Sequence, residues 1–238
     1  MNLIDYLKRH SNVLIPAAGD GETFMQLNAT NTPAIFLSGK LTARNLIAEN
    51  SEGLLSVTEY AQFAHNMRIK KEKQLILDLQ SGFGNPLNTF YAAKKLERSG
   101  GDVLLLNDQS YPSYPIEKPA VTTDEDLVGK VRASLDSFDN PETQLWVKLD
   151  GLHEYGIAGF KKRAQYIANA GAHAIVLANY SSEELKTICS LNLALPLIAT
   201  STKRAKEANN KVIAWLDDEG YLLQRVNEMK KQILEEWL

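Results

Sequence analysis

Eight short apolar segments alternate with helical patterns along this chain, and this alternation constrains its fold more than any other feature. The segments are rich in Val, Ile and Leu, and each has the length of a buried strand. They cover residues 12–16, 33–37, 74–77, 103–106, 145–148, 174–177, 196–199 and 212–215. Strands that alternate with helices pair in parallel through crossover connections. The pattern therefore predicts an α/β fold with a parallel sheet.

A helical pattern follows each of these segments. The patterns cover residues 22–29, 56–70, 86–99, 124–136, 156–170, 182–191, 203–208 and 219–237. Eight parallel strands with eight outer helices in a chain of 238 residues is the arithmetic of a (β/α)8 TIM barrel. A doubly wound open sheet is the alternative, but the turn at residues 17–20 has too few glycines for a dinucleotide site. We predict a single barrel domain over residues 1–238, because no linker or low-complexity tract divides the chain.

Composition excludes several classes of partner and location. With 26 Lys and Arg against 29 Asp and Glu, the net charge of −3 does not favour nucleic acid. No apolar run approaches the roughly 20 residues that a membrane span needs. The start of the sequence lacks the basic and then apolar order of a secretion signal. Cys189 is the single cysteine, which permits no internal disulfide, so we expect a cytoplasmic protein.

Chemistry in a barrel concentrates just past the carboxyl ends of the strands. The most informative strand end is the segment Asp78-Leu79-Gln80-Ser81-Gly82-Phe83-Gly84-Asn85. It delivers an acid, then two glycines around an aromatic residue, and then a helix start. Such a segment places a carboxylate beside backbone amides, which suits an anionic ligand or a metal-bridged one. The segment Asn107-Asp108-Gln109 ends the following strand in the same way.

At these residues the chain resembles the isocitrate lyase and phosphoenolpyruvate mutase superfamily. The family motif on the third strand reads roughly DADTGFGN, and residues 78–85 read DLQSGFGN. The fourth-strand motif, an acid pair followed by an aromatic residue and a proline, corresponds to residues 107–112. The second-strand signature corresponds to Ser38-Gly39. The similarity runs in one order from about Val13 to Glu235, and the chain looks like a diverged, C-terminally short member similar to the phosphoenolpyruvate phosphomutases.

The resemblance implies an enzyme that acts on a small 2-oxo acid or phosphonate through an enolate and makes or breaks a C–C or P–C bond. It implies a Mg2+ ion at Asp78 and at the position of Gln80. The residues expected to act in catalysis are Lys148, Asp108 and Glu49, with Glu52 as the alternative to Glu49 in the same loop. The residues expected to bind the anionic substrate are Ser38, Gly39, Lys40, Gly82, Asn107 and Asn179.

The chain departs from the family pattern at residues that would bind the metal and the substrate. Gln80 and Asn107 are amides where the family has acids, and Mg2+ prefers anionic oxygens, so we expect weakened metal binding. Lys148 stands where the family has an arginine and loses its bidentate fork. The loop at residues 110–119 lacks the cysteine of the lyase branch. These changes leave two further hypotheses. One is a metal-independent reaction in which Lys148 and side-chain amides polarise the substrate. The other is a non-catalytic relative that binds a small anion or a protein partner.

The end of the chain carries an apolar stripe at helical spacing. Its members are Leu222, Leu223, Val226, Met229, Ile233 and Trp237. Two interpretations remain open for it. The stripe packs on the chain's own barrel, or it forms a contact in a homo-oligomer.

Overall fold

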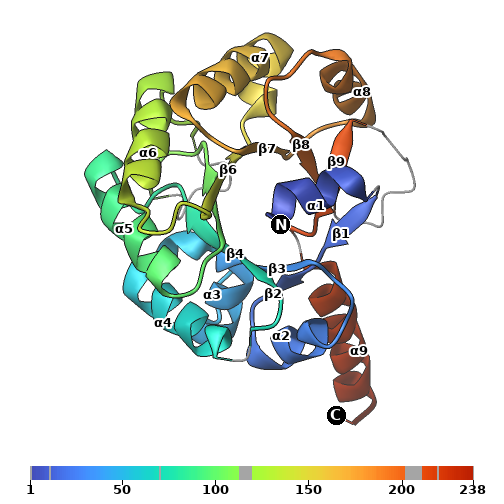
Figure 1. Cartoon of the computed structure of the whole chain (residues 1–238). Coiled ribbons are helices and arrows are strands. Elements are labelled where there is room, and N and C mark those ends of the chain that lie inside the picture. The colour runs from blue at the N-terminus through green and yellow to red at the C-terminus, as the bar shows by residue number, and fades with distance from the viewer. Residues whose placement is uncertain are drawn as a thin grey trace.

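The structure, a computed structural model, describes residues 2–10, 12–69, 71–112, 120–201, 211–218 and 220–237, without the side chains of 222 and 223. Its strands form one parallel ring (Figure 1). They are β1 (Val13–Ile15), β2 (Ala17–Ala18), β3 (Ala34–Leu37), β4 (Gln74–Gln80), β5 (Val103–Asn107), β6 (Gln144–Leu149), β7 (Ala174–Leu177), β8 (Leu197–Thr200) and β9 (Val212–Leu216). The prediction of a (β/α)8 barrel is confirmed.

The ring closes through the first strand segment, which Pro16 divides into β1 and β2. β1 pairs in parallel with β9, and β2 pairs in parallel with β3. The other strands pair with their sequence neighbours, also in parallel. The two short pieces thus occupy one strand position and leave no edge strand in the ring. All eight predicted strand segments lie within this barrel.

Helices surround the ring, except the first, which lies across it (Figure 1). They are α1 (Leu3–Arg9), α2 (Gly21–Asn28), α3 (Gly39–Ile47), α4 (Val57–Arg68), α5 (Pro86–Arg98), α6 (Asp124–Ser137), α7 (Leu152–Ala170), α8 (Ser182–Ser190) and α9 (Tyr221–Trp237), with the short 3-10 helix η1 (Glu52–Leu54). Pro86 begins α5 and Asn85 caps it, as the sequence predicts. Gly156, with φ of 62°, separates a first turn of α7 from the rest of the helix.

Two helices that the sequence analysis does not predict prove important. α1 packs Leu3, Ile4 and Leu7 into the apolar cluster inside the ring, and Figure 1 shows α1 lying across it. Because α1 directly precedes β1, it closes the amino ends of the strands. α3 follows β3 and brings its amino end to the opposite, open end. The helix predicted at 203–208 lies outside the described residues.

The barrel interior is a packed core rather than a pore. Its largest residue is Trp146, which is fully buried, and its indole N–H donates to the Gln144 side chain at 3.0 Å. Side chains alternate between the two faces of a strand, so Trp146, Lys148 and Asp150 share the inward face of β6. The apolar layers therefore give way to charged residues at the carboxyl ends of the strands.

The last helix, α9, is largely exposed. Val226, Met229, Ile233 and Trp237 of its apolar stripe are 40%, 63%, 47% and 85% exposed. The barrel therefore covers this stripe only in part, and Met229 and Trp237 are mostly uncovered. Across the described residues, no helix combines the length and the apolar character that a membrane span requires.

His173 is expected to make the fold sensitive to acid. Its Nδ1 accepts the Leu145 N–H at 3.1 Å, and burial lowers its pKa below the ordinary 6.5. The unfolded chain then binds more protons than the folded one, so this contribution to stability is present above pH 6.5 and is lost as the pH falls below it. His173→Asn keeps an acceptor without a titrating ring. We expect the thermal midpoint of the variant to fall less than that of the wild type between pH 7.5 and 5.5; equal falls would contradict this role.

Candidate functional site

A lysine ammonium lies among carboxyl groups at the open end of the barrel. Lys148 places its Nζ 3.3 Å from an Asp150 oxygen and 3.2 Å from an Asp218 oxygen, and its side chain is 11% exposed. Asp150 follows Lys148 by two residues, and Asp218 follows the end of β9. Neither acid is among the predicted site residues, although strand-end position and two-residue spacing from an inward residue point to both.

Burial of these charges shifts their pKa values. Removal from water, and then the Asp78 carboxylate, raise the pKa of Glu52 to about 8. Burial raises the pKa of Asp150 to about 7 against the opposing effect of Lys148. Burial alone would lower the pKa of Lys148, but Asp150, Asp218 and the other acids outweigh it and hold this pKa well above its ordinary value. At neutral pH the ammonium therefore stays charged, while Glu52 can carry a proton.

Asp78, at the end of β4, is fixed by backbone N–H groups from two elements. Its Oδ2 accepts the Gly39 N–H at 3.0 Å, and its Oδ1 accepts the Gln80 N–H at 2.9 Å. The Tyr60 hydroxyl, from α4, accepts the Asp78 N–H at 2.8 Å and donates to the Leu37 carbonyl. These contacts anchor the Asp78 carboxylate beside the first residue of α3.

The amino end of α3 is partly occupied by the protein's own acceptors. The Gly39 N–H binds Asp78, and the Leu41 N–H binds the Ser38 side chain at 3.3 Å. Lys40 is half-buried in the first turn of the helix. The resemblance assigns the backbone amides here to a substrate anion. In this chain a bound anion would have to share them with Asp78.

Glu52, rather than Glu49, belongs to the site. The Glu52 Oε1 accepts from the Asn107 side-chain amide at 3.3 Å, and Glu52 and Lys148 act on each other's pKa. Glu49 is exposed. The Asn107 Oδ1 accepts the Gln109 N–H at 3.1 Å, so the amide turns its N–H2 group toward Glu52. The acid predicted for this loop therefore corresponds to its alternative, Glu52.

Asp108 has different surroundings from those its predicted catalytic role requires. Its Oδ1 accepts the Asp150 N–H at 2.8 Å, while its Oδ2 accepts from the Tyr155 hydroxyl at 2.9 Å and from Arg163 at 3.2 Å. The residue is 0% exposed. Arg163 also donates to the Thr122 carbonyl at 2.6 Å. Because neighbouring strand residues face opposite ways, Asn107 takes the inward direction and Asp108 points toward α7. Asp108 thus holds the backbone of Asp150 in place.

The described contacts of Gly82 and Asn179 do not include the lysine. Gly82 has a φ of 87°, a backbone conformation that residues with a side chain rarely adopt. It packs against Thr89 of α5, whose hydroxyl donates to the Gly82 carbonyl at 2.9 Å. Asn179 is exposed, and its amide donates to the Asp150 carbonyl at 3.3 Å. The structure therefore brings Asn179 to the rim and places Gly82 in the layer of the outer helices.

The donor set does not fit a Mg2+ ion. Mg2+ binds few protein carboxylates and keeps several waters, which need acceptors around them. Asp78 and Asp108 keep their carboxylates among the motif positions, but Asp108 is paired with Arg163, and Asn107 offers a donor to the site. Gln80 is 1% exposed, and within the described residues its amide has no hydrogen-bond partner. Nor do these residues hold a group of three or more acids, histidines or cysteines that could bind a metal.

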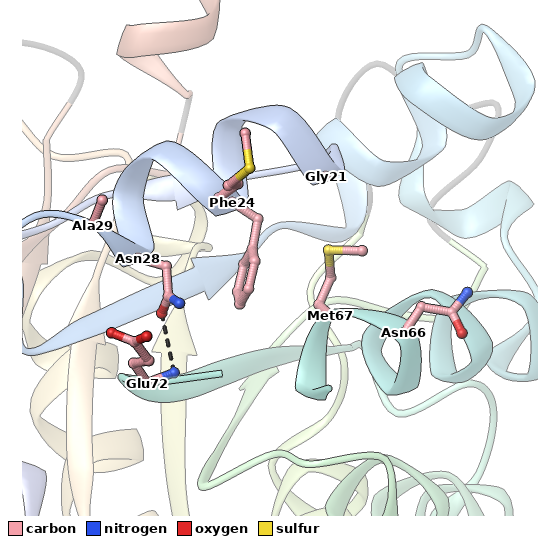
Figure 2. Close-up of a pocket in the computed structure, with 8 residues that line it drawn as sticks. Gly21, Phe24, Asn28, Ala29, Asn66, Met67 and Glu72 are labelled. Atoms are coloured by element: carbon pink, nitrogen blue, oxygen red, sulfur yellow. Dashed lines mark hydrogen bonds between the residues drawn. The ribbon is translucent and has the colours of Figure 1, made fainter. Parts of the chain in front are cut away.

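A separate cavity of about 530 Å³ lies on the outside of the ring between α2 and the end of α4 (Figure 2). Phe24 and Met67 line it, and beside them the Glu72 N–H donates to the Asn28 side chain at 3.1 Å. Its lining is mostly apolar and includes no predicted site residue. The clustered charges make the barrel mouth the better candidate for chemistry.

Comparison with known proteins agrees with this fold. The chain matches no family model. It is 26% identical over 183 residues to 2,3-dimethylmalate lyase of Eubacterium barkeri, and the alignment covers 76% of this chain and 63% of that enzyme. The chain therefore spans less than two thirds of this relative's length.

Solved structures share the whole barrel. A phosphonopyruvate hydrolase in complex with oxalate and Mg2+ superposes with a TM-score of 0.84 at 18% identity, over 99% of this chain and 87% of that one. A phosphoenolpyruvate phosphomutase from Streptomyces platensis subsp. rosaceus gives 0.83 at 17% identity, over 98% and 86%. At these identities the likeness concerns the fold.

Proposed function

Because this chain is a member of the phosphoenolpyruvate mutase/isocitrate lyase superfamily, whose enzymes cleave C–C or P–C bonds of small 2-oxo acids, we propose that it carries out such a cleavage at its barrel mouth. The substrate is a small 2-oxo acid or phosphonate, and the reaction passes through an enolate. The observation that carries the proposal is the Lys148 ammonium, buried among acids where the strands end.

Four polar residues at the mouth take a part in this proposal. Lys148 binds a substrate oxygen and balances the negative charge that develops on the enolate. Glu52, with a pKa of about 8, holds a proton at neutral pH that it can deliver to the enolate carbon. Asn107 positions the Glu52 carboxyl group through its side-chain amide. Asp78 keeps the start of α3 against the mouth.

A non-catalytic barrel that binds a small anion or a protein partner is the second candidate. The observation that favours it is the pair of amides at Gln80 and Asn107, which replace two acids of the family motif. Such a protein would bind oxalate, the ligand of the related hydrolase structure, but would not convert any of the candidate substrates.

Turnover separates the two candidates. The purified chain is incubated with oxaloacetate and with phosphonopyruvate, and the products are followed by proton and phosphorus NMR. Product formed from either of them, inhibited by oxalate, is the expected result. Oxalate binding without turnover of this panel would favour the second candidate, and absence of both would overturn the proposed function.

We also propose that the chain forms a homo-oligomer through α9 and that it works in the cytoplasm. The exposed apolar stripe on α9 supports the homo-oligomer, since uncovered stripes of this kind are typical of contact surfaces. The lone thiol of Cys189 supports the cytoplasmic location. Light scattering after size-exclusion chromatography would give the mass in solution; a monomer would contradict the proposed homo-oligomer.

Asp218 is expected to compete with a bound anion for Lys148. Both of its oxygens approach the ammonium, at 3.2 and 3.4 Å, and its side chain is 23% exposed against 5% for Asp150. Asp218→Asn removes this negative charge and should raise the affinity for oxalate at least about tenfold, the equivalent of about 1.4 kcal/mol. Calorimetric titration measures the change, with Asp139→Asn on the surface as the matched control. Equal affinities in variant and wild type would show that Asp218 does not compete.

A further inference from the structure

We propose that the Lys148 ammonium takes the place of the divalent cation at this barrel mouth, so that the site binds its anionic ligand without a metal. The inference rests on the proposed function. It names Lys148 as the group that supplies the positive charge of the site. It is carried by the disagreement between the residues present and the needs of Mg2+, together with the position of Lys148.

The oxygens at the motif positions have protein partners already. Both Asp78 oxygens accept backbone N–H groups, at 3.0 and 2.9 Å. The Asn107 oxygen accepts the Gln109 N–H at 3.1 Å. What Asn107 presents to the site is its N–H2 group, which donates to Glu52 at 3.3 Å. Waters bound to a metal are themselves donors, so this amide opposes a hydrated cation and favours an acceptor such as a ligand oxygen.

Lys148 has the environment that a resident cation needs. Asp150 and Asp218 hold its Nζ at 3.3 and 3.2 Å, and Glu52 and Asp78 lie near enough to act on its charge. An ammonium has three N–H donors, and the two described ion pairs account for two carboxylates. One donor can therefore turn to a ligand oxygen while the more deeply buried Asp150 keeps the lysine in place.

Gln80 offers a second donor. Its side chain is buried, with both amide atoms unpartnered within the described residues, and its backbone adjoins the Asp78 carboxylate. A buried polar group without a partner destabilises a fold. A ligand carboxylate would satisfy the amide N–H. A metal ion at this position would instead need the protein carboxylate that the family motif has in place of Gln80.

The test is a set of calorimetric titrations on the full chain after treatment with EDTA and its removal. Mg2+ is titrated alone, and oxalate is then titrated in metal-free buffer and in buffer with Mg2+, with the free oxalate concentration corrected for the complex that oxalate forms with Mg2+ in solution. We expect no heat from Mg2+ alone and oxalate affinities that agree within about twofold. Oxalate binding that requires Mg2+ would overturn the inference and leave the proposed function intact. No oxalate binding in either buffer would overturn both.

A gain-of-metal variant provides the matched comparison. The double variant Gln80→Asp/Asn107→Glu restores the acids of the family motif, and it should bind oxalate at least about tenfold more tightly with Mg2+ than without. Circular dichroism and the thermal midpoint establish that the variant is folded. If the folded variant shows no response to Mg2+, the two amides are not what removed the metal, and the inference fails. Gln80→Asp alone, which leaves the Asn107–Glu52 contact intact, repeats the comparison if the double variant does not fold.

Discussion

Replacing Lys148 with methionine is expected to lower the affinity for oxalate at least about a hundredfold, and turnover of any substrate by a similar factor. Methionine keeps the length and packing of the side chain but removes the ammonium that Asp150 and Asp218 hold. Deleting one group that stabilises developing charge costs about 100- to 1,000-fold in well-studied enzymes. Four acids, Asp150, Asp218, Glu52 and Asp78, act on the charge of Lys148, so its removal leaves their negative charge to oppose an anion.

A second buried lysine supplies the control. Lys130 of α6 is 2% exposed and pairs with Asp126 at 2.7 Å, behind Gly82 rather than at the mouth. Lys130→Met should therefore leave oxalate affinity unchanged, whatever it does to stability. Lys148→Arg keeps the charge in a different shape and should restore part of the binding. Binding of oxalate by the folded Lys148→Met protein at wild-type affinity would contradict the assignment of Lys148.

The strands could be predicted from the sequence because they are buried on both faces. In a parallel barrel each strand then reads as a short unbroken apolar run, such as Val103 to Leu106. α1 gives a much weaker signal, because a helix of seven residues gains its stability from packing Leu3, Ile4 and Leu7 into the barrel rather than from its own propensity. α3 begins directly at a functional motif, and its start is fixed by the Ser38 cap rather than by a regular apolar stripe.

At the site, the sequence predicts which strand ends reach the barrel mouth better than it predicts which side chains face into it. The ends of β4, β5 and β6 do bring Asp78, Asn107 and Lys148 to one mouth. Whether Asn107 or Asp108 faces inward depends on the register of β5 in the barrel, and the partner that decides it, Arg163, lies 55 residues further along the chain. The choice between Glu49 and Glu52 depends on the path of an irregular loop. Such contacts over long sequence distances leave no periodic trace in a single sequence.

Replacing Asp108 with asparagine is expected to lower the free energy of unfolding by about 3 kcal/mol. The change leaves the guanidinium of Arg163, which is 8% exposed, without its fully buried carboxylate, and breaking one partner of a buried pair costs about 3–5 kcal/mol. We expect the lower end, because Arg163 keeps Asp124 at 3.1 Å. Urea denaturation followed by circular dichroism measures the loss.

The surface pair at Asp139 makes this prediction specific. Asp139 contacts Lys94 at 3.1 Å and Arg98 at 2.7 Å, but it is 50% exposed, and exposed pairs contribute about 0–1 kcal/mol. Asp139→Asn should therefore cost less than about 1 kcal/mol by the same measurement. A catalytic Asp108 predicts the reverse pattern, in which Asp108→Asn is as stable as Asp139→Asn but inactive. A large loss of stability, with oxalate still bound by the fraction that remains folded, is the result that identifies Asp108 as the residue that positions Asp150.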